Sequence, residues 1–158
     1  MDKEKEIKNS VELKYNYNQL KIFSFIIILI NFFIIVIFSG VGFTKAFYYV
    51  IVIYNCLFLP IIIYFISSIF RIKKNIPNYV FQETLLDEPR PLFRGSMYFK
   101  VTIVNEKGEK INKNTKAIFY PSYVFGGLSF DDYFRKKVLV AYNPINEDVV
   151  VVKLIDSE

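Results

Sequence analysis

The chain has 158 residues, of which 53% are hydrophobic and 22% are charged, and its formal net charge is +5. It contains no His and one Cys, which excludes Cys/His zinc sites, disulfides within the chain, and Ser-His-Asp or Cys-His catalytic groups. We therefore expect a protein that is not an enzyme and that holds neither a metal nor another cofactor. The hydrophobic excess also excludes an intrinsically disordered chain.

The positive charge is confined to the first half of the chain. Residues 1–78 contain nine Lys or Arg and four Asp or Glu, whereas residues 79–158 contain equal numbers of bases and acids. A nucleic-acid-binding domain should carry its excess charge as a patch on the folded surface. We therefore do not expect nucleic acid as a partner.

Residues 1–21 form a charged segment in which acids alternate with lysines at the start. Ile7, Val11 and Tyr15 recur every four residues, which is the spacing of one helix face. We expect a short amphipathic helix that leads into the membrane.

Residues 22–70 are expected to form a transmembrane hairpin, with uncharged spans at 22–40 and 46–70. The first span has 19 residues. As a helix it would be about 28 Å long, close to the roughly 30 Å of a hydrocarbon core. Both spans are rich in β-branched residues, but in lipid only a helix satisfies its own backbone. A signal peptide is the alternative for the first span, yet the apolar run exceeds the usual core of about 7 to 15 residues and no small-x-small site follows.

The distribution of Lys and Arg predicts the orientation of this hairpin. Five precede the first span, Lys45 lies in the connecting loop, and four lie within residues 71–90. The positive-inside rule places both termini in the cytoplasm, and we expect the protein in the inner (cytoplasmic) membrane of the cell. Arg71, Lys73 and Lys74 would form a basic flank at the membrane surface. We interpret it as a stop-transfer flank, with recognition of anionic lipid as the alternative.

Two polar residues lie deep in the predicted hairpin. Asn31 is nine residues before Gly40, and Asn55 is nine residues after Ala46. These positions have the same depth in an antiparallel hairpin, so we predict a hydrogen bond between the two Asn side chains. A clamp inside the hairpin is the favoured interpretation, and a pore or a contact with a partner helix is the alternative. Pro60 should kink the second helix.

From residue 79 onward the hydrophobic period changes to two, after a linker at residues 71–78. Residues 96–104 alternate cleanly between apolar and polar side chains, which is typical of a half-buried strand. Gly108 closes a turn after it, and a less regular return strand resumes at residues 116–120. The pattern also predicts a final hairpin of residues 137–143 and 148–155.

Two further segments complete the predicted β-domain of residues 79–158. Residues 79–86 are a candidate fifth strand, followed by a stiff connector at 87–91. Residues 129–132 fit the S-x-x-[DE] start of a short helix that we expect at 130–136, after a bend at Gly126 and Gly127 that lacks the pattern of a phosphate-binding loop.

Two pairs of charged residues in this domain are candidate sites. Asp131 and Asp132 are adjacent, so they point in different directions on a helix, and helix capping explains them better than catalysis. Arg90 and Arg94 could hold a carboxylate or phosphate, but an exposed loop is the favoured interpretation.

These elements predict an α+β membrane protein. An N-terminal antiparallel transmembrane helical hairpin is followed by a small antiparallel β-sheet or barrel of four to five strands with one short helix. A domain of this size has a modest core and exposed strand edges, which can pair with a partner strand or with another copy.

The final hairpin carries Val138, Val140, Tyr142 and Pro144, followed by four valines at residues 149–152. Over about 20 residues, this pattern resembles small uncharacterised bacterial membrane proteins that have an N-terminal two-helix transmembrane hairpin and a C-terminal small β-domain. The resemblance implies this layout and brings no catalytic residues with it.

We predict a non-catalytic integral membrane protein whose cytoplasmic β-domain acts as a protein-interaction or self-assembly module. Its partners would be the lipid bilayer and a protein partner or further copies of the chain. The alternative is a membrane-bound immunity protein that protects the cell against a toxin or bacteriocin. An enzyme acting on lipid is disfavoured, because the sequence shows no converging carboxylates and no Lys/Tyr pair near the membrane surface.

Overall fold

The computed structural model describes residues 2–92, 95–105, 107–121 and 127–155, which form two compact units. One unit is Asn16–Ile69, and the other combines Met1–Tyr15 with Phe70–Glu158. The first is helical and the second contains all the described strands, which confirms the predicted α+β class.

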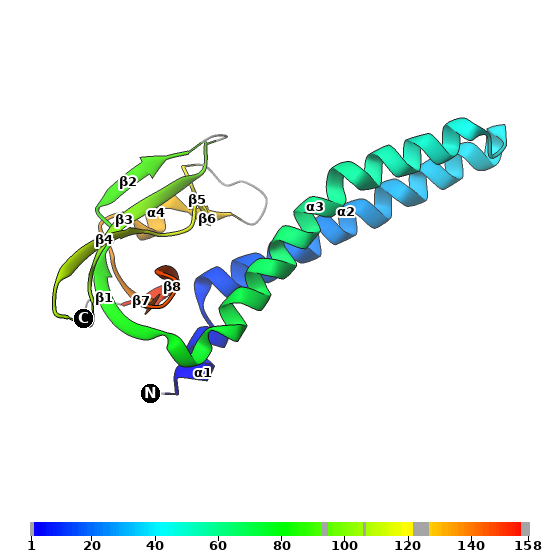
Figure 1. The fold of residues 1–158 in the computed structure, drawn as a ribbon. Coiled ribbons are helices and arrows are strands. Elements are labelled where there is room, and N and C mark those ends of the chain that lie inside the picture. The colour runs from blue at the N-terminus through cyan, green and yellow to red at the C-terminus, as the bar shows by residue number, and fades with distance from the viewer. Residues whose placement is uncertain (1, 93–94, 106, 122–126, 156–158) are drawn as a thin grey trace. The chain divides into compact units, whose positions relative to one another are not determined.

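Two long helices, α2 (Val11–Val41) and α3 (Lys45–Lys74), contain the predicted hydrophobic spans. In the unit Asn16–Ile69 they run antiparallel and side by side (Figure 1). Gly42 begins the connection between them with a φ of 91°, which is a conformation that glycine adopts at little cost. Both helices are long and apolar enough to cross a membrane, and most of their apolar side chains are not buried inside the structure.

Aromatic side chains hold the two helices against each other. Phe23 and Phe65 stack with their ring centroids 5.8 Å apart, and Phe38 meets Phe47 edge to face at 5.3 Å near the connection. The second helix continues through Pro60.

The other unit begins with α1 (Lys3–Lys8), which the Asp2 side chain caps at its N-terminus. Residues 9–10 separate α1 from α2, and the Ser10 hydroxyl accepts a hydrogen bond from the N–H of Leu13 at 3.3 Å. This hydrogen bond starts the second helix.

The predicted amphipathic face is wrong at Val11, because the helix is broken between α1 and α2. Ile7 and Tyr15 are buried as expected, but Val11 is only half-buried, whereas Glu12 and Leu13 are buried. A single continuous helix would have placed Val11 on the buried face, and the break rotates α2 relative to that pattern.

The short helix η1 (Ile76–Asn78) leads from α3 into the strands. The described residues contain eight strands and one further helix, α4: β1 (Val80–Leu85), β2 (Glu88–Pro91), β3 (Met97–Val104), β4 (Lys110–Asn114), β5 (Phe119–Tyr120), β6 (Leu128–Ser129), α4 (Phe130–Tyr133), β7 (Lys137–Asn143) and β8 (Asp148–Leu154). One sheet has the order β1-β7-β8. The other has the order β2-β3-β5-β6, with β4 also pairing with β3.

A side chain from β1 joins the two sheets. The Gln82 amide donates to the carbonyl of Val104 at 2.6 Å and accepts from the N–H of the same residue at 2.8 Å, so it takes the place of a paired strand. The Thr84 hydroxyl donates to the carbonyl of Thr102 at 3.2 Å. As a result, β1 and β2 follow one curved path beside β3 (Figure 1).

The core of the β-region is aromatic at one end and rich in valine at the other. Phe99 lies edge to face with Phe119 at 4.9 Å and stacks on Phe130 at 5.6 Å. In β7 and β8, Val140 and Val150 are completely buried. Burying such side chains contributes about 1.5 to 3 kcal/mol each and is the main stabilising term of the domain.

The predicted strands at 96–104 and at 79–86 are confirmed as β3 and β1, and the final hairpin is confirmed as β7 and β8. The number of strands was underestimated. The connector at 87–91 contains β2, and the return strand starts as β4 at Lys110, while residues 116–120 contain only β5. The β5–β6 pair is parallel, unlike the antiparallel pairs elsewhere.

The helix predicted at 130–136 ends earlier, at Tyr133, because Phe134 is extended and Arg135 has a positive φ of 58°. Ser129 is its N-cap residue, but its side chain does not make the capping hydrogen bond that we expected. Gly126, one of the two glycines of the predicted bend, lies outside the described residues.

Candidate functional site

Five charged or hydroxyl side chains meet inside the unit that contains the strands, and we call them the Asp148 cluster: Glu12, Arg71, Tyr79, Lys116 and Asp148. The Tyr79 hydroxyl donates a hydrogen bond to Asp148 Oδ2 at 3.1 Å. Asp148 Oδ1 lies 3.5 Å from Arg71 Nη1 and 3.7 Å from Lys116 Nζ. Arg71 Nη2 also lies 3.8 Å from Glu12 Oε1. The Asp148 carboxylate is therefore the centre of the cluster.

Each member of the cluster comes from a different part of the fold. Glu12 lies in the first turn of α2, and Arg71 lies in the last turn of α3. Tyr79 follows η1, Lys116 follows β4, and Asp148 is the first residue of β8. The hydrogen bond and ion pairs of the cluster thus connect the first turn of α2 and the last turn of α3 to the strands of the same unit.

Burial controls the electrostatics of Glu12. Its side chain is 1% exposed, and loss of hydration is the main cause that raises its pKa, followed by the charge of Asp148. Arg71, Lys116 and a backbone hydrogen bond from Val151 lower the pKa, and the net value is about 8. Glu12 therefore keeps its proton through much of the neutral range.

The same causes act on Tyr79. Burial, followed by the charge of Asp148 and the hydrogen bond to it, raises the pKa of the Tyr79 hydroxyl far above its usual range. The hydroxyl consequently remains a donor to Asp148 at every physiological pH.

A carboxyl group that titrates near neutral pH is also a feature of general acids and bases. In the Asp148 cluster, however, the acids contact cations and a hydroxyl group of the chain itself. None of its five members lines either of the two hollows described next. The cluster is therefore better explained as a connection within the domain than as a site for a substrate.

Two adjoining hollows lie on the same unit, and we call them together the β4 hollow. The larger one, of about 390 Å³, lies between β4, the turn before it and the β7–β8 hairpin, and it is lined by Asn105, Lys107, Ile111, Lys113, Tyr142, Pro144 and Glu147. The smaller one, of about 230 Å³, shares three of these residues and adds Val80, Gln82 and Val104.

Three exposed apolar side chains lie in or beside the β4 hollow, among polar lining residues. Val80 and Val104 are each 43% exposed, and Ile145, which follows Pro144, is 75% exposed. One ion pair crosses the hollow, between Lys113 Nζ and Glu147 Oε2 at 2.6 Å. Exposed apolar groups around a polar contact are typical of a protein-binding surface rather than of a catalytic centre.

The structure brings Asn31 and Asn55 together. The Asn55 side-chain amide donates to Asn31 Oδ1 at 3.0 Å, and the Asn31 amide donates to Asn55 Oδ1 at 3.3 Å. Each amide also donates to the carbonyl four residues earlier in its own helix, at 2.9 Å for Asn31 and 2.8 Å for Asn55. Both NH₂ groups are therefore fully used within the hairpin.

The three residues of the predicted basic flank have different surroundings. Arg71 contacts Asp148 and Glu12, so its guanidinium group faces carboxyl groups of the domain. Lys73 and Lys74 are exposed in the last turn of α3.

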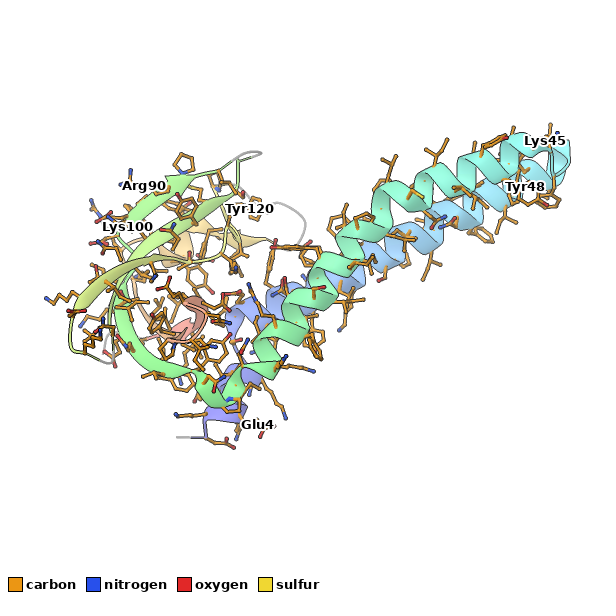
Figure 2. All side chains as sticks on the ribbon, in the orientation of Figure 1. Glu4, Lys45, Tyr48, Arg90, Lys100 and Tyr120 are labelled. Carbon is orange, nitrogen blue, oxygen red and sulfur yellow. The ribbon has the colours of Figure 1, made fainter. Side chains whose placement is uncertain are left out.

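The candidate residues Asp131, Asp132 and Arg90 lie on the surface. Asp131 and Asp132 are exposed in α4. Arg90 lies 3.8 Å from Glu88, which is also 3.7 Å from Lys100, and Figure 2 shows Arg90 and Lys100 close to each other beside β2 and β3. Arg94 lies outside the described residues.

The sequence analysis does not identify four members of the Asp148 cluster: Glu12, Tyr79, Lys116 and Asp148. One signal was available: Glu12 is the last acidic residue before Glu83, so it is isolated beside a hydrophobic span. An acid in this position indicates a contact inside the protein, and Arg71 occupies the matching end of the other helix. Nothing in the local pattern marks Asp148, which reads as a turn residue.

Among the described residues, no three His, Cys, Asp or Glu side chains come together as a metal site requires. Comparison with protein-family models, with curated proteins and with solved structures finds no match to this chain.

Proposed function

We propose that this chain is a non-catalytic integral membrane protein whose β-domain binds a protein partner at the cytoplasmic surface. The β4 hollow with its exposed apolar rim is the observation that supports this proposal. Covering such a surface with a protein is favourable, because it removes apolar area from water.

Two further observations support the membrane part of the proposal. The helices α2 and α3 are long and apolar enough to span a bilayer. Their exposed side chains include Phe25 and Ile28, which are 65% and 68% exposed. Contact with lipid costs these apolar side chains no free energy, whereas their exposure to water is unfavourable.

A photo-crosslinking amino acid placed at Ile145 in the full-length protein tests partner binding in living cells. Ile145 lies beside the β4 hollow, and Asp131, exposed in α4, is the matched control position. We expect a discrete crosslinked product from position 145 and none from position 131. Equal products from both positions, or none from either, would contradict the proposal.

Protection against a toxin or bacteriocin stays a prediction from the sequence, with no structural observation that favours it. Survival of cells that carry or lack this gene, when challenged with the product of a neighbouring toxin gene, would test it.

A further inference from the structure

One exposed face of α2 changes from basic to apolar along the helix, which is continuous from Val11 to Val41. Six exposed residues spaced by three or four positions lie on this face, and we call them the α2 stripe: Lys14, Asn18, Lys21, Phe25, Ile28 and Phe32. The last three are 65%, 68% and 58% exposed. The stripe therefore changes from basic to apolar between Lys21 and Phe25.

The apolar part of the stripe lies in a helix that is long and apolar enough to span a bilayer. In the membrane proposed above, acyl chains of lipid cover Phe25, Ile28 and Phe32. Lys21 is then about 6 Å along the helix axis from Phe25, and Lys14 is about 10 Å beyond Lys21. Side chains of a helix lean toward its N-terminus, so the Lys21 ammonium group extends away from the apolar part. A phospholipid lying along the apolar part has its headgroup at the level of Lys21.

The chain itself does not offset the charge of the two lysines of the stripe. Residues 7–82 contain one acid, Glu12, whose side chain is 1% exposed and contacts Arg71. Among the described residues, no carboxylate lies within ion-pair distance of Lys14 or Lys21. The basic part of the stripe therefore complements an anionic headgroup better than a zwitterionic one.

The predicted basic flank at the end of α3 is a weaker candidate for such a lipid. Arg71 lies 3.5 Å from Asp148 and 3.8 Å from Glu12, so its charge is used within the domain. Lys74 is exposed, but it lies on α3 and is not part of the α2 stripe. A lipid site at the stripe and a diffuse attraction by all exposed lysines therefore predict different effects of Lys21 and Lys74.

We propose that the α2 stripe binds one anionic phospholipid, with its phosphate at Lys21 and its acyl chains along Phe25, Ile28 and Phe32. Lys14 adds electrostatic attraction to the same headgroup. A lysine near an anionic lipid surface increases affinity about fivefold. This inference rests on the membrane part of the proposed function, because it names the class of lipid that contacts one of the spanning helices.

Tryptophan fluorescence of the full-length protein in lipid vesicles tests this inference. The chain contains no Trp, so Phe25→Trp provides a single reporter on the stripe. The vesicles contain equal parts of phosphatidylglycerol and phosphatidylcholine, and one lipid or the other carries dibrominated acyl chains, which quench Trp on contact. The two quenching measurements give the ratio of the binding constants of the anionic and the zwitterionic lipid. We expect this ratio to be about five or more, and a ratio of one would overturn the proposal.

Lys21→Gln, in the chain that carries the reporter, is the decisive variant and should lower the ratio about fivefold. Lys21→Arg keeps the positive charge and should keep the ratio. Lys74→Gln removes one exposed charge from α3 and is the matched control, which should change the ratio less than about twofold. Equal losses from Lys21→Gln and Lys74→Gln would show a diffuse effect of surface charge and would refute the site.

Two other occupants of the stripe would give different results. If neither brominated lipid quenches the Trp reporter, another helix covers the stripe, and the proposal is overturned. If millimolar inorganic phosphate lowers the ratio to one, the lysines bind a free anion and the lipid is refuted. Should Phe25→Trp fail to fold, judged by circular dichroism, Ile28→Trp takes its place on the same face, with the same expected ratios.

Extraction of membranes with alkaline carbonate separates a failure of this inference from a failure of the proposed function. Release of the chain would contradict the membrane part of the proposed function, and the lipid site with it. If the chain stays in the membrane while the ratio is one, only the lipid site is contradicted.

Discussion

The Tyr79 hydroxyl and the Asp148 carboxylate are joined by a hydrogen bond of 3.1 Å although they are 69 residues apart in the chain. Tyr79 follows η1, which leads from α3 into the strands, and Asp148 starts the last strand. This contact therefore connects the residue before β1 to the first residue of β8. Arg71 adds a second connection to the same carboxylate at 3.5 Å.

Tyr79→Phe should destabilise the domain, because it removes a hydrogen bond to a charged acceptor while leaving the buried ring in place. We expect the free energy of unfolding to fall by about 1.5 to 3 kcal/mol. Chemical denaturation of the full-length protein in detergent measures this change. Tyr120→Phe is the control and should change the free energy of unfolding by less than about 0.5 kcal/mol. Equal effects of the two substitutions would show that the contact contributes little.

Glu12 should make the stability of the domain depend on pH. Its pKa is about 8 in the folded chain and 4.5 as the ordinary value, so between these values the folded state holds a proton that the unfolded state has released. The stabilising contribution is therefore complete below about pH 4.5 and is lost as the pH rises to about 8 and beyond.

Thermal unfolding of the full-length protein between about pH 5 and pH 9 tests this dependence. The Tm of the wild type should fall with increasing pH relative to the Tm of Glu12→Gln, which stays neutral throughout. Glu4→Gln removes a carboxylate from the exposed face of α1 and serves as the control. Parallel curves for the wild type and Glu12→Gln would refute a raised pKa.

How far the sequence predicts the strands depends on their burial pattern. β3 alternates apolar and polar residues because one face is buried, and its bounds follow from that pattern. β4 reads KINKN, in which Ile111 is the only apolar residue, so its period carries no signal. The prolines of β2 predict a connector, because proline lacks the N–H that a paired strand uses. Their outward positions, which make the strand possible, follow from the hydrogen-bond register and not from the sequence.

Contacts within the structure were predictable only where geometry fixes them. Asn31 and Asn55 are equally far from the connection between two antiparallel helices, so counting residues places them together. Tyr79 and Asp148 meet because a curved sheet folds back on the helix ends, and no local pattern encodes that path. The pKa of Glu12 follows from the same long-range packing.

The reciprocal hydrogen bonds of Asn31 and Asn55 should couple the two helices energetically. In a double-mutant cycle with Asn31→Leu and Asn55→Leu, we expect a coupling free energy of about 0.6 kcal/mol, the mean for such contacts in membrane helices. Unfolding in lipid bicelles measures each variant. Ile28→Ala and Val52→Ala, at two exposed positions, form the control cycle and should be additive.

The predicted orientation can be tested by labelling cysteines in intact cells, with Cys56 replaced by Ser. Lys45 and Tyr48 mark the end of the helical hairpin where α2 and α3 are joined (Figure 2). Thr44→Cys introduces a thiol in that connection, and Asp131→Cys introduces one in α4 of the β-domain. Because most of the Lys and Arg flank the other ends of the helices, we expect the connection to lie outside the cytoplasm.

A membrane-impermeant maleimide should therefore label the Thr44→Cys variant in intact cells and the Asp131→Cys variant only after permeabilisation. The reverse pattern would place the β-domain outside the cell, where a cytoplasmic partner cannot reach the β4 hollow. Labelling of both variants in intact cells would contradict a hairpin that spans the bilayer, because a single pair of spanning helices keeps the connection and the β-domain on opposite sides.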